Sequence, residues 1–530
     1  MHNKLTRRDF WTLPVLVALL GILALMSLQS GHWWGDDYAG YLNEAIAISE
    51  GRLDEQVHLN VMMHPSPMTF LEEDADTLTY VWGYPLILSV IHRFVGYDTW
   101  NYSSLIFYKL PGVCALAALG GLLFLFYRRH FSYFPSLVLS LLFCLNPQFF
   151  SEVNNISPEL PFLFCFVLGL WLVEVMLDQQ RLLRRILLMI ALGAALWASC
   201  ILRLNGTALI AFVALAHFIG IFRTVPKTKR LLFDLVPYVI CGLLLLVSYS
   251  IFPAPTSNHS DVGKLAFSTL WANIRYYFQL LIGWFSSLFS PTTDGIFYAK
   301  ASGYLMFGFM LLGIWKKGFR KDFHLTLIIL STFVTVCLLD YQQGLRYLYT
   351  ILPFALLFAA HGAAVFFSKL SSHVDSFLRS RSRLTAFAVS LLVAITMFGS
   401  TSQQALTCFR TRGDALPDLN PYSTYAVDTY RYIQSETDEQ SVIAFYKPRA
   451  LYLNTGRLSF KPQIAAELVV NPDAFLPYQP HYRPLTDADY VLFFDDRNHD
   501  EYQRVLTELD GSALLEPVYE NKYFELYKIV

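Results

Sequence analysis

Two adjacent carboxylates, Asp36 and Asp37, follow the first long apolar run of the chain, in Trp33-Trp34-Gly35-Asp36-Asp37-Tyr38-Ala39-Gly40-Tyr41. Carboxylates just beyond a membrane boundary cost desolvation energy unless they lie in water or take part in chemistry. In water, either one can remove a proton from a hydroxyl group as a general base. A simpler interpretation stays open, because Asp is common at helix starts: one of the pair would then only cap a helix over 38–49 that stops at Gly51.

Other polar residues lie at the ends of apolar runs that face the same side: Lys109, Glu159, Arg203 and the pair Arg346-Tyr347. Each cation could contact lipid headgroups or a bound anionic ligand, and Lys109 could simply extend toward the headgroups. Glu159 could be there only because a helix dipole favours an acid in the first turn.

Carboxylates and cations at one membrane surface suit a transferase that takes a sugar from a phospholipid carrier. A departing lipid phosphate gains negative charge, which Lys or Arg stabilises. The incoming hydroxyl must lose a proton to a carboxylate, and positive charge that develops on the sugar also favours a nearby carboxylate.

The composition is that of a membrane protein. Of the 530 residues 55% are hydrophobic and only 15% are charged, whereas about a quarter are charged in soluble domains. The formal net charge of -1 offers no basic excess to hold nucleic acid. Six of the seven Cys lie in apolar runs, which argues against a disulfide framework or a zinc site built from cysteines.

About eleven apolar runs approach the length of a bilayer span. The first, Trp11 to Leu28, predicts an uncleaved anchor, and the others lie near 106–127, 134–150, 158–178, 186–202, 207–222, 231–252, 300–315, 324–340, 350–367 and 384–400. Basic residues recur at the N-terminus and on every second connection, at 128–130, 181–185, 223–230, 316–321 and 369–383. By the positive-inside rule these segments are cytoplasmic, in an inner or plasma membrane, and Asp36 and Asp37 are not.

The predicted fold is therefore a polytopic α-helical membrane domain over 1–400, followed by an extracytoplasmic soluble α/β domain over 401–530. Two long outer loops, 29–105 and 253–299, contain apolar stretches too broken to span, which predict helices along the membrane face. In the C-terminal domain, strand-like runs at 441–445, 490–494 and 523–529 alternate with helical ones at 425–435 and 501–509.

In order and spacing, several short motifs resemble those of the GT-C membrane glycosyltransferases, above all the protein O-mannosyltransferase and lipid A aminoarabinose transferase group. The motifs are Gly35-Asp36-Asp37-x-x-x-Tyr41 with Gly51-Arg52 after a helix, Trp82-Gly83-Tyr84-Pro85-Leu86, Pro158-Glu159-Leu160-Pro161-Phe162, and Arg346-Tyr347 followed by Pro353. The resemblance implies an inverting transfer of a hexose or pentose from a polyprenyl-phosphate donor, on the non-cytoplasmic face, to a lipid, glycan or protein.

The resemblance also assigns expected roles. Asp36 matches the catalytic base and Asp37 its acidic neighbour, although the family often has Asp-Glu here, so which carboxylate takes the proton stays open. Lys109 and Arg346 match contacts to the donor phosphate. Glu159 matches an acidic residue of the second outer loop.

No cofactor is expected. An alternative is a divalent-metal site in the long first outer loop, which carries His58, His64, Glu72, Glu73, Asp74 and Asp76. These residues lack close ligand spacing, so a solvated acidic loop is the default interpretation.

Two further classes of function remain as alternatives. A transporter or flippase of lipid-linked precursors would place charges near the bilayer midplane and repeat its halves. A scaffold would use the spans only to anchor an external binding domain, for which one span would do.

Overall fold

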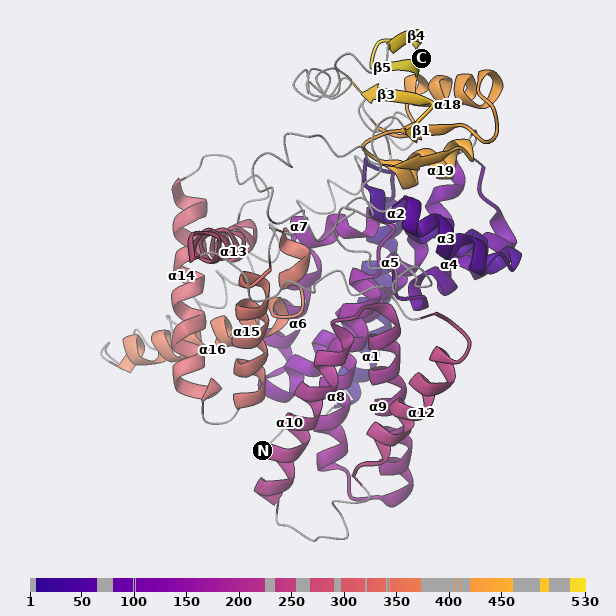
Figure 1. The fold of residues 1–530 in the computed structure, drawn as a ribbon. Coiled ribbons are helices and arrows are strands. Elements are labelled where there is room, and N and C mark those ends of the chain that lie inside the picture. The colour runs from indigo at the N-terminus through magenta and orange to yellow at the C-terminus, as the bar shows by residue number, and fades with distance from the viewer. Residues whose placement is uncertain are drawn as a thin grey trace.

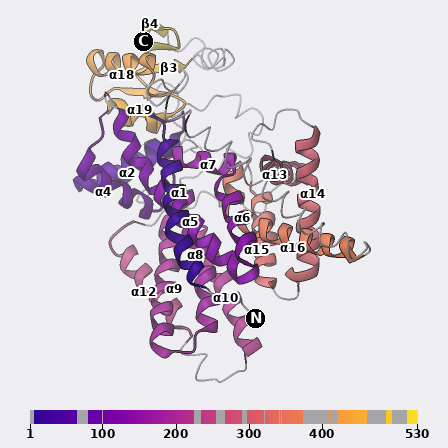
Figure 2. The same cartoon turned by 180° about the vertical axis from the view of Figure 1, so that it is seen from behind.

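The computed structural model of the protein describes residues 6–63, 80–98, 100, 102–224, 234–253, 267–289, 297–319, 322–339, 342, 344–372, 406, 410, 420–460, 487–494 and 515–530. Helices make up the described chain as far as residue 372, and a small mixed sheet with two helices follows (Figure 1). The C-terminus lies at the end of the molecule that carries the sheet, and the N-terminus lies among the helices away from it, as the reverse view also shows (Figure 2).

Five helices in the described part of the chain are long and apolar enough to cross a membrane. They are α1 (Arg7–Met26), α5 (Leu105–His130), α8 (Glu159–Asp178), α9 (Leu182–Leu202) and α16 (Leu352–Ser372). A sixth span results if α6 (Tyr133–Cys144) is joined to α7 (Pro147–Phe150) and η4 (Ser151–Asn154) across a 57° bend. The chain is therefore an integral, multi-pass membrane protein.

Ten of the eleven predicted spans coincide with helices, which include α10 (Gly206–Thr224), α12 (Val236–Tyr249), α14 (Phe297–Gly313) and α15 (Phe323–Cys337). The eleventh, 384–400, lies outside the described residues. Helix α12 begins at Val236 with Pro237 in its first turn, where a proline is tolerated. A π-helical turn, η5 (Ile314–Gly318), continues α14.

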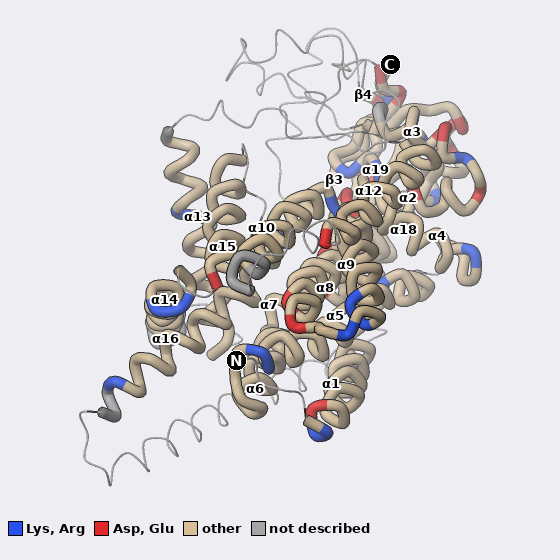
Figure 3. The backbone as a smooth tube through the Cα atoms, turned by 90° about the horizontal axis from the view of Figure 1, so that it is seen from below, with Lys and Arg blue, Asp and Glu red and all other residues tan. Residues whose placement is uncertain are grey.

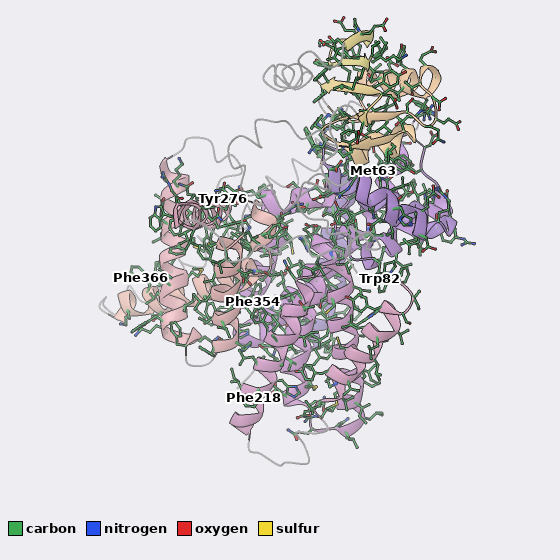
Figure 4. All side chains as sticks on the ribbon, viewed as in Figure 1. Met63, Trp82, Phe218, Tyr276, Phe354 and Phe366 are labelled. Carbon is green, nitrogen blue, oxygen red and sulfur yellow. The ribbon has the colours of Figure 1, made fainter. Side chains whose placement is uncertain are left out.

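Glycines bring α14 and α16 into close contact. A Cβ atom built on Gly313 would overlap the carbonyl of Phe358, and one on Gly362 would overlap that of Phe309. Small residues of this kind let membrane helices approach each other closely. Nearby, Phe354 is fully buried whereas Phe366 is 47% exposed, in keeping with their central and peripheral positions in Figure 4.

Charged residues in the membrane domain gather at helix ends (Figure 3). At the end of α5, the Arg128 Nε lies 2.7 Å from an Asp9 carboxylate oxygen of α1. Beside it, the Arg129 Nε lies 2.7 Å from a Glu174 carboxylate oxygen of α8. Buried ions need such partners, because an unpaired charge at this depth is costly.

The Lys317 ammonium of η5 lies at the centre of a second inner cluster. Its Nζ lies 3.1 Å from the His130 Nδ1, 2.5 Å from the His361 Nε2 and 3.3 Å from an Asp322 carboxylate oxygen. These three partners form the group of described residues with the spacing of a metal site. The Lys317 ammonium already contacts both histidine nitrogens and the carboxylate of this group. We therefore interpret the cluster as a set of polar contacts that joins η5 to the neighbouring helices.

The two long connections 29–105 and 253–299 contain helices in their described parts, as predicted. The first contains α2 (Asp36–Glu50), α3 (Leu53–Met62), α4 (Gly83–Val95) and the short η3 (Tyr102–Ser104), and the second contains α13 (Phe267–Ser287). Another short turn, η6 (Leu345–Leu348), precedes α16. Trp82 stacks on Phe252 with ring centroids 4.4 Å apart, which joins the start of α4 to the residues after α12 (Figure 4).

The C-terminal domain has a five-stranded sheet in the order β2-β1-β3-β5-β4. Its elements are α18 (Thr424–Glu436), β1 (Val442–Ala444), α19 (Pro448–Thr455), β2 (Leu458–Phe460), β3 (Tyr490–Phe494), β4 (Leu515–Glu520) and β5 (Phe524–Ile529). Strand β1 is parallel to β2 and β3, whereas β5 is antiparallel to β3 and β4. Three strands and α18 agree with the predictions; the predicted helix at 501–509 lies outside the described residues.

An aromatic residue from the membrane domain joins the core of the sheet domain. Trp34 lies between α1 and α2, and its ring centroid is 5.2 Å from that of Phe494 and 5.9 Å from that of Phe445. Beside it, α19 packs on α2. The acidic pair that follows Trp34 is thereby placed where the two domains meet.

Candidate functional site

Helix α2 carries the acidic pair in its first turn. The cap residue is Gly35, which has no side chain to donate or accept, so the prediction that Asp36 or Asp37 caps this helix is wrong. The helix does end at Gly51, which adopts the left-handed conformation with φ 71°. Both carboxylates therefore lie within the helix, where the dipole favours negative charge, and both remain available to other partners.

Lys109 of α5 holds the segment that leads into α2. Its Nζ donates hydrogen bonds to the carbonyl oxygens of Gln29, at 2.8 Å, and Gly31, at 2.7 Å. The side chain is only 1% exposed, so it does not extend to the headgroups. Lys109 thus holds in place the backbone that precedes the acidic pair. Its described hydrogen bonds do not reach the carboxylates.

His32 fixes the same segment from the other side. The Ile156 N–H donates to the His32 Nε2 at 3.1 Å, so the Nδ1 must carry the proton that it shares with the Trp33 carbonyl oxygen, 2.8 Å away. Burial and the nearby Lys109 charge lower the pKa of His32 to about 3. This histidine is therefore neutral and structural at physiological pH.

Asp37 has partners from two distant parts of the chain. Arg346 of η6 donates from its Nη1 to the Asp37 Oδ2 at 2.8 Å, and the Tyr80 hydroxyl donates to the Oδ1 at 2.9 Å. Burial alone would raise the pKa of Asp37, but the charge and hydrogen bond of Arg346 outweigh it and lower the pKa, with help from Arg449 and Tyr80. The lowered pKa keeps Asp37 ionised at neutral pH. Its side chain is 47% exposed and therefore accessible.

Asp36 points to the C-terminal domain instead. Its Oδ1 accepts a hydrogen bond from the backbone N–H of Arg449, in the first turn of α19, at 3.1 Å. Its side chain is only 10% exposed. Burial raises the pKa of Asp36, and the charges of Arg449 and Lys447 offset this only in part. Asp36 thus accepts from the first turn of a helix in the other domain, α19, and does not cap α2.

Glu159 and Arg203 form the second half of the cluster. The Arg203 Nη1 donates to the Glu159 Oε1 at 2.5 Å, which joins the start of α8 to the end of α9. The Arg203 guanidinium lies 5.5 Å from the Tyr347 ring centroid, and Arg346 lies 5.6 Å from the same ring. Tyr347 is therefore flanked by two cations, each paired with a carboxylate.

The structure thus brings together Asp37, Glu159, Arg203, Arg346 and Tyr347, five of the seven residues that the sequence singles out. Tyr41, one turn after Asp37, lies within electrostatic range of all four charged members. Asp36 adjoins this group but faces α19, and Lys109 lies beneath it.

Tyr80 and Arg449 complete the cluster and are absent from the sequence-based prediction. Tyr80 lies just before the Trp82-Gly83-Tyr84-Pro85 motif, which was a signal for its neighbourhood. Arg449 gave no such signal, because it lies more than 400 residues from Asp36 in a helix that was not predicted. Only the packing of the two domains makes it part of the site.

The loop residues suggested as metal ligands are not part of the described site. His64, Glu72, Glu73, Asp74 and Asp76 lie outside the described residues, and His58 lies on α3. In the part of the chain that the structure describes, the carboxylates of the site are each paired with arginines or a tyrosine.

No model of a protein family matches this sequence, and neither does any curated protein. Solved structures match almost over its whole length. ArnT from Cupriavidus metallidurans bound to undecaprenyl phosphate has a TM-score of 0.54 and 12% identity, covering 98% of this chain and 97% of ArnT. The apo ArnT structure gives a TM-score of 0.55 at 12% identity.

AglB, an oligosaccharyltransferase from Archaeoglobus fulgidus, is a second match. Its complex with an inhibitory peptide and a dolichol-phosphate has a TM-score of 0.57 and 11% identity, covering 98% of this chain and 74% of AglB. At such identities the likeness concerns the fold. In its membrane helices and its C-terminal domain, this chain has the fold of the GT-C glycosyltransferases ArnT and AglB.

Proposed function

We propose that this protein is an inverting glycosyltransferase that moves a sugar from a polyprenyl-phosphate carrier to a lipid, glycan or protein acceptor at the non-cytoplasmic face of the membrane. The observation that carries the proposal is the joining of two carboxylate–arginine pairs, Asp37–Arg346 and Glu159–Arg203, around Tyr347. The solved structures with undecaprenyl phosphate and dolichol-phosphate support a lipid-phosphate ligand for this fold.

Asp37 is the better candidate for the base. The resemblance gave that position to Asp36, but Asp36 is nearly buried and already accepts a bond from α19. Asp37 keeps almost half of its side-chain surface accessible, and its lowered pKa keeps it ionised at neutral pH. A group must be ionised to accept a proton.

The arginines suit the leaving phosphate. Arg346 is 38% exposed and Arg203 is 19% exposed, so both can meet a ligand while their carboxylate partners hold them in place. Arginine's planar donors match phosphate oxygens in pairs. Glu159, at 4% exposed, orients Arg203 from behind.

These roles give a balanced single displacement. The acceptor oxygen bonds to the anomeric carbon of the sugar while its proton passes to the Asp37 carboxylate. The bond from that carbon to the phosphate oxygen breaks, and polyprenyl phosphate leaves with the electron pair, which Arg346 and Arg203 stabilise. One displacement without a covalent enzyme intermediate inverts the anomeric configuration.

The expected contact between Lys109 and the donor phosphate is not the main role that we assign to this residue. Its ammonium donates to two carbonyls, so a direct contact would require the segment 29–31 to move. We assign it the role of positioning the acidic pair. The transporter alternative gains nothing here, because the charged pairs of the described helices lie at helix ends.

The proposal is tested by reconstituting the purified protein in liposomes with a panel of polyprenyl-phosphate-linked hexoses and pentoses. Transfer releases polyprenyl phosphate, which is measured by mass spectrometry of the lipid extract. Release that depends on the protein and on an added acceptor is the expected result. Movement of intact donor between leaflets, with no release, would replace the transferase by a flippase.

A further inference from the structure

Arg449 joins the C-terminal domain to α2 and to Tyr80 through three hydrogen bonds. Its backbone N–H donates to Asp36 at 3.1 Å, and its carbonyl oxygen accepts from the Asn43 Nδ2 at 3.2 Å. Its side chain, 2% exposed, extends past α2, and the Nη1 donates to the Tyr80 hydroxyl at 2.6 Å. The backbone thus anchors α19, while the guanidinium reaches toward the site.

The direction of this chain of hydrogen bonds is fixed by chemistry. An ionised carboxylate only accepts, so the single Tyr80 proton must point to the Asp37 Oδ1, 2.9 Å away. The Tyr80 oxygen must then accept from Arg449, which only donates. A donor that itself accepts a charge-assisted bond becomes a stronger donor.

We infer that Arg449 is a positioning residue that acts on Asp37 through Tyr80, so that the docked C-terminal domain switches the membrane-domain site into its active arrangement. The inference rests on the proposed role of Asp37 as the base. It adds that the base is complete only when α19 lies on α2. Neither Arg449 nor Tyr80 needs to touch the sugar.

We call the hydrogen-bonded series Arg449–Tyr80–Asp37 the relay. Charged groups from the elements packed around it also face its members. Asp37 faces Arg346 of η6, while Arg449 faces Asp36 and Glu44 of α2, and Lys447 precedes α19. Loss of the Arg449 charge would remove one of the two arginines that lower the pKa of Asp37, the other being Arg346. The carboxylate would then be less well stabilised, and its pKa would rise.

A purely structural role for Arg449 makes different predictions from a relay. The replacement Tyr80→Phe removes one oxygen and leaves both backbone bonds of Arg449 intact. Domain docking should therefore survive while the relay is cut. Arg449→Met removes the charge, and Arg449→Lys retains it with poorer geometry. Tyr430→Phe is the matched control, since its buried hydroxyl in α18 has no hydrogen-bond partner among the residues that the structure describes.

The test measures kcat and the KM for the lipid-linked donor between about pH 4 and pH 8. We expect Tyr80→Phe and Arg449→Met to lower kcat about tenfold or more and to move the acid limb of the profile upward. Arg449→Lys should recover part of the loss. The KM for the donor, undecaprenyl phosphate binding and protease resistance of the C-terminal domain should stay near wild type.

Infrared titration measures the pKa of the Asp37 carboxyl in the absence of sugar transfer. The band of this carboxyl is identified by subtracting the spectrum of Asp37→Asn. A pKa raised in Tyr80→Phe and unchanged in Tyr430→Phe supports the relay. An unchanged pKa and acid limb in Tyr80→Phe overturn it. If wild type transfers no sugar at all, the proposed function fails, whereas the titration still decides whether Arg449 and Tyr80 act on Asp37.

Discussion

At the scale of single residues, two adjacent carboxylates with the same sequence context have different surroundings. The Asp36 side chain is 10% exposed and lies against the backbone of α19, whereas the Asp37 side chain is 47% exposed and paired with Arg346. Their pKa values move in opposite directions for this reason. Pairs of titratable groups pushed apart in this way often divide acid–base roles between them.

Replacement of Arg346 should change the pH dependence of transfer. The folded-state pKa of Asp37 lies below its ordinary value of 3.8 because Arg346 outweighs the effect of burial. In Arg346→Met the pKa rises, so activity is lost at a higher pH as the solution is acidified. A profile of kcat against pH measures this, with Arg431→Met, a surface change in α18, as the control. An acid limb that does not move would contradict the account.

The raised pKa of Asp36 means that its ionised form destabilises the folded protein, in contrast to Asp37, whose pKa is lowered. The pKa of Asp36 is raised in the folded protein, so its contribution to stability is fully present below 3.8 and is lost as pH rises through the raised folded value. Asp36→Asn keeps an acceptor for the Arg449 N–H and removes this loss. The melting temperature in detergent at neutral pH should therefore stay equal or rise; a clear fall would show that the negative charge itself holds α19.

At the scale of elements, hydrophobic periodicity and length sufficed for most helices. The apolar runs fixed ten helical segments, and Gly51 correctly ended α2. Two local features were not predicted correctly: Gly35, not an aspartate, is the N-cap residue of α2, and the helix α19 with its Arg449 was missed. Short elements such as α19 carry too few residues for periodicity to identify, and tertiary contact decides them.

The contact between α14 and α16 provides a test at this scale. Since a Cβ at Gly362 would overlap the Phe309 carbonyl, Gly362→Leu should force the helices apart and lower the melting temperature. Gly242→Leu on α12 is the matched control, because a Cβ there meets no atom of the described chain within 4 Å. Equal stability of the two variants in detergent would contradict the described helix contact.

The inner ends should be equally sensitive to unpaired charge. Arg128→Met leaves Asp9 buried without its partner, and breaking a buried pair costs about 3–5 kcal/mol. Replacement of both residues by neutral ones, Asp9→Asn together with Arg128→Met, should recover part of this lost stability. Thermal unfolding of the purified variants measures both, and additive losses in the double variant would show that the pair does not interact.

At the scale of the whole molecule, the site exists because α2, the residues before α4, the start of α8, the end of α9, η6 and α19 meet. The sequence motifs located Asp37, Glu159, Arg203 and Arg346, which the fold brings into one cluster. They could not locate Arg449, since nothing in a sequence of this kind reports which soluble helix will dock on α2. The likeness of the fold to ArnT and AglB covers 98% of this chain and so extends over both domains.

The orientation of the whole molecule can be measured with single cysteines. Basic helix ends predict a cytoplasmic side that contains Arg184, opposite the side that contains the C-terminal domain. Ser435→Cys and Arg184→Cys both place a thiol at an exposed position. An impermeant maleimide applied to intact cells should label only the first variant, and labelling of Arg184→Cys before permeabilisation would reverse the proposed topology.

In the proposed mechanism Asp37 removes the acceptor proton and Asp36 does not. Transfer by Asp37→Asn and Asp36→Asn, measured as polyprenyl phosphate released in liposomes, distinguishes the two carboxylates. We predict a loss of about 10²–10⁴-fold in kcat for Asp37→Asn, as for removal of a general base, and a much smaller change for Asp36→Asn. Full activity in Asp37→Asn, or a greater loss in Asp36→Asn, would contradict the account.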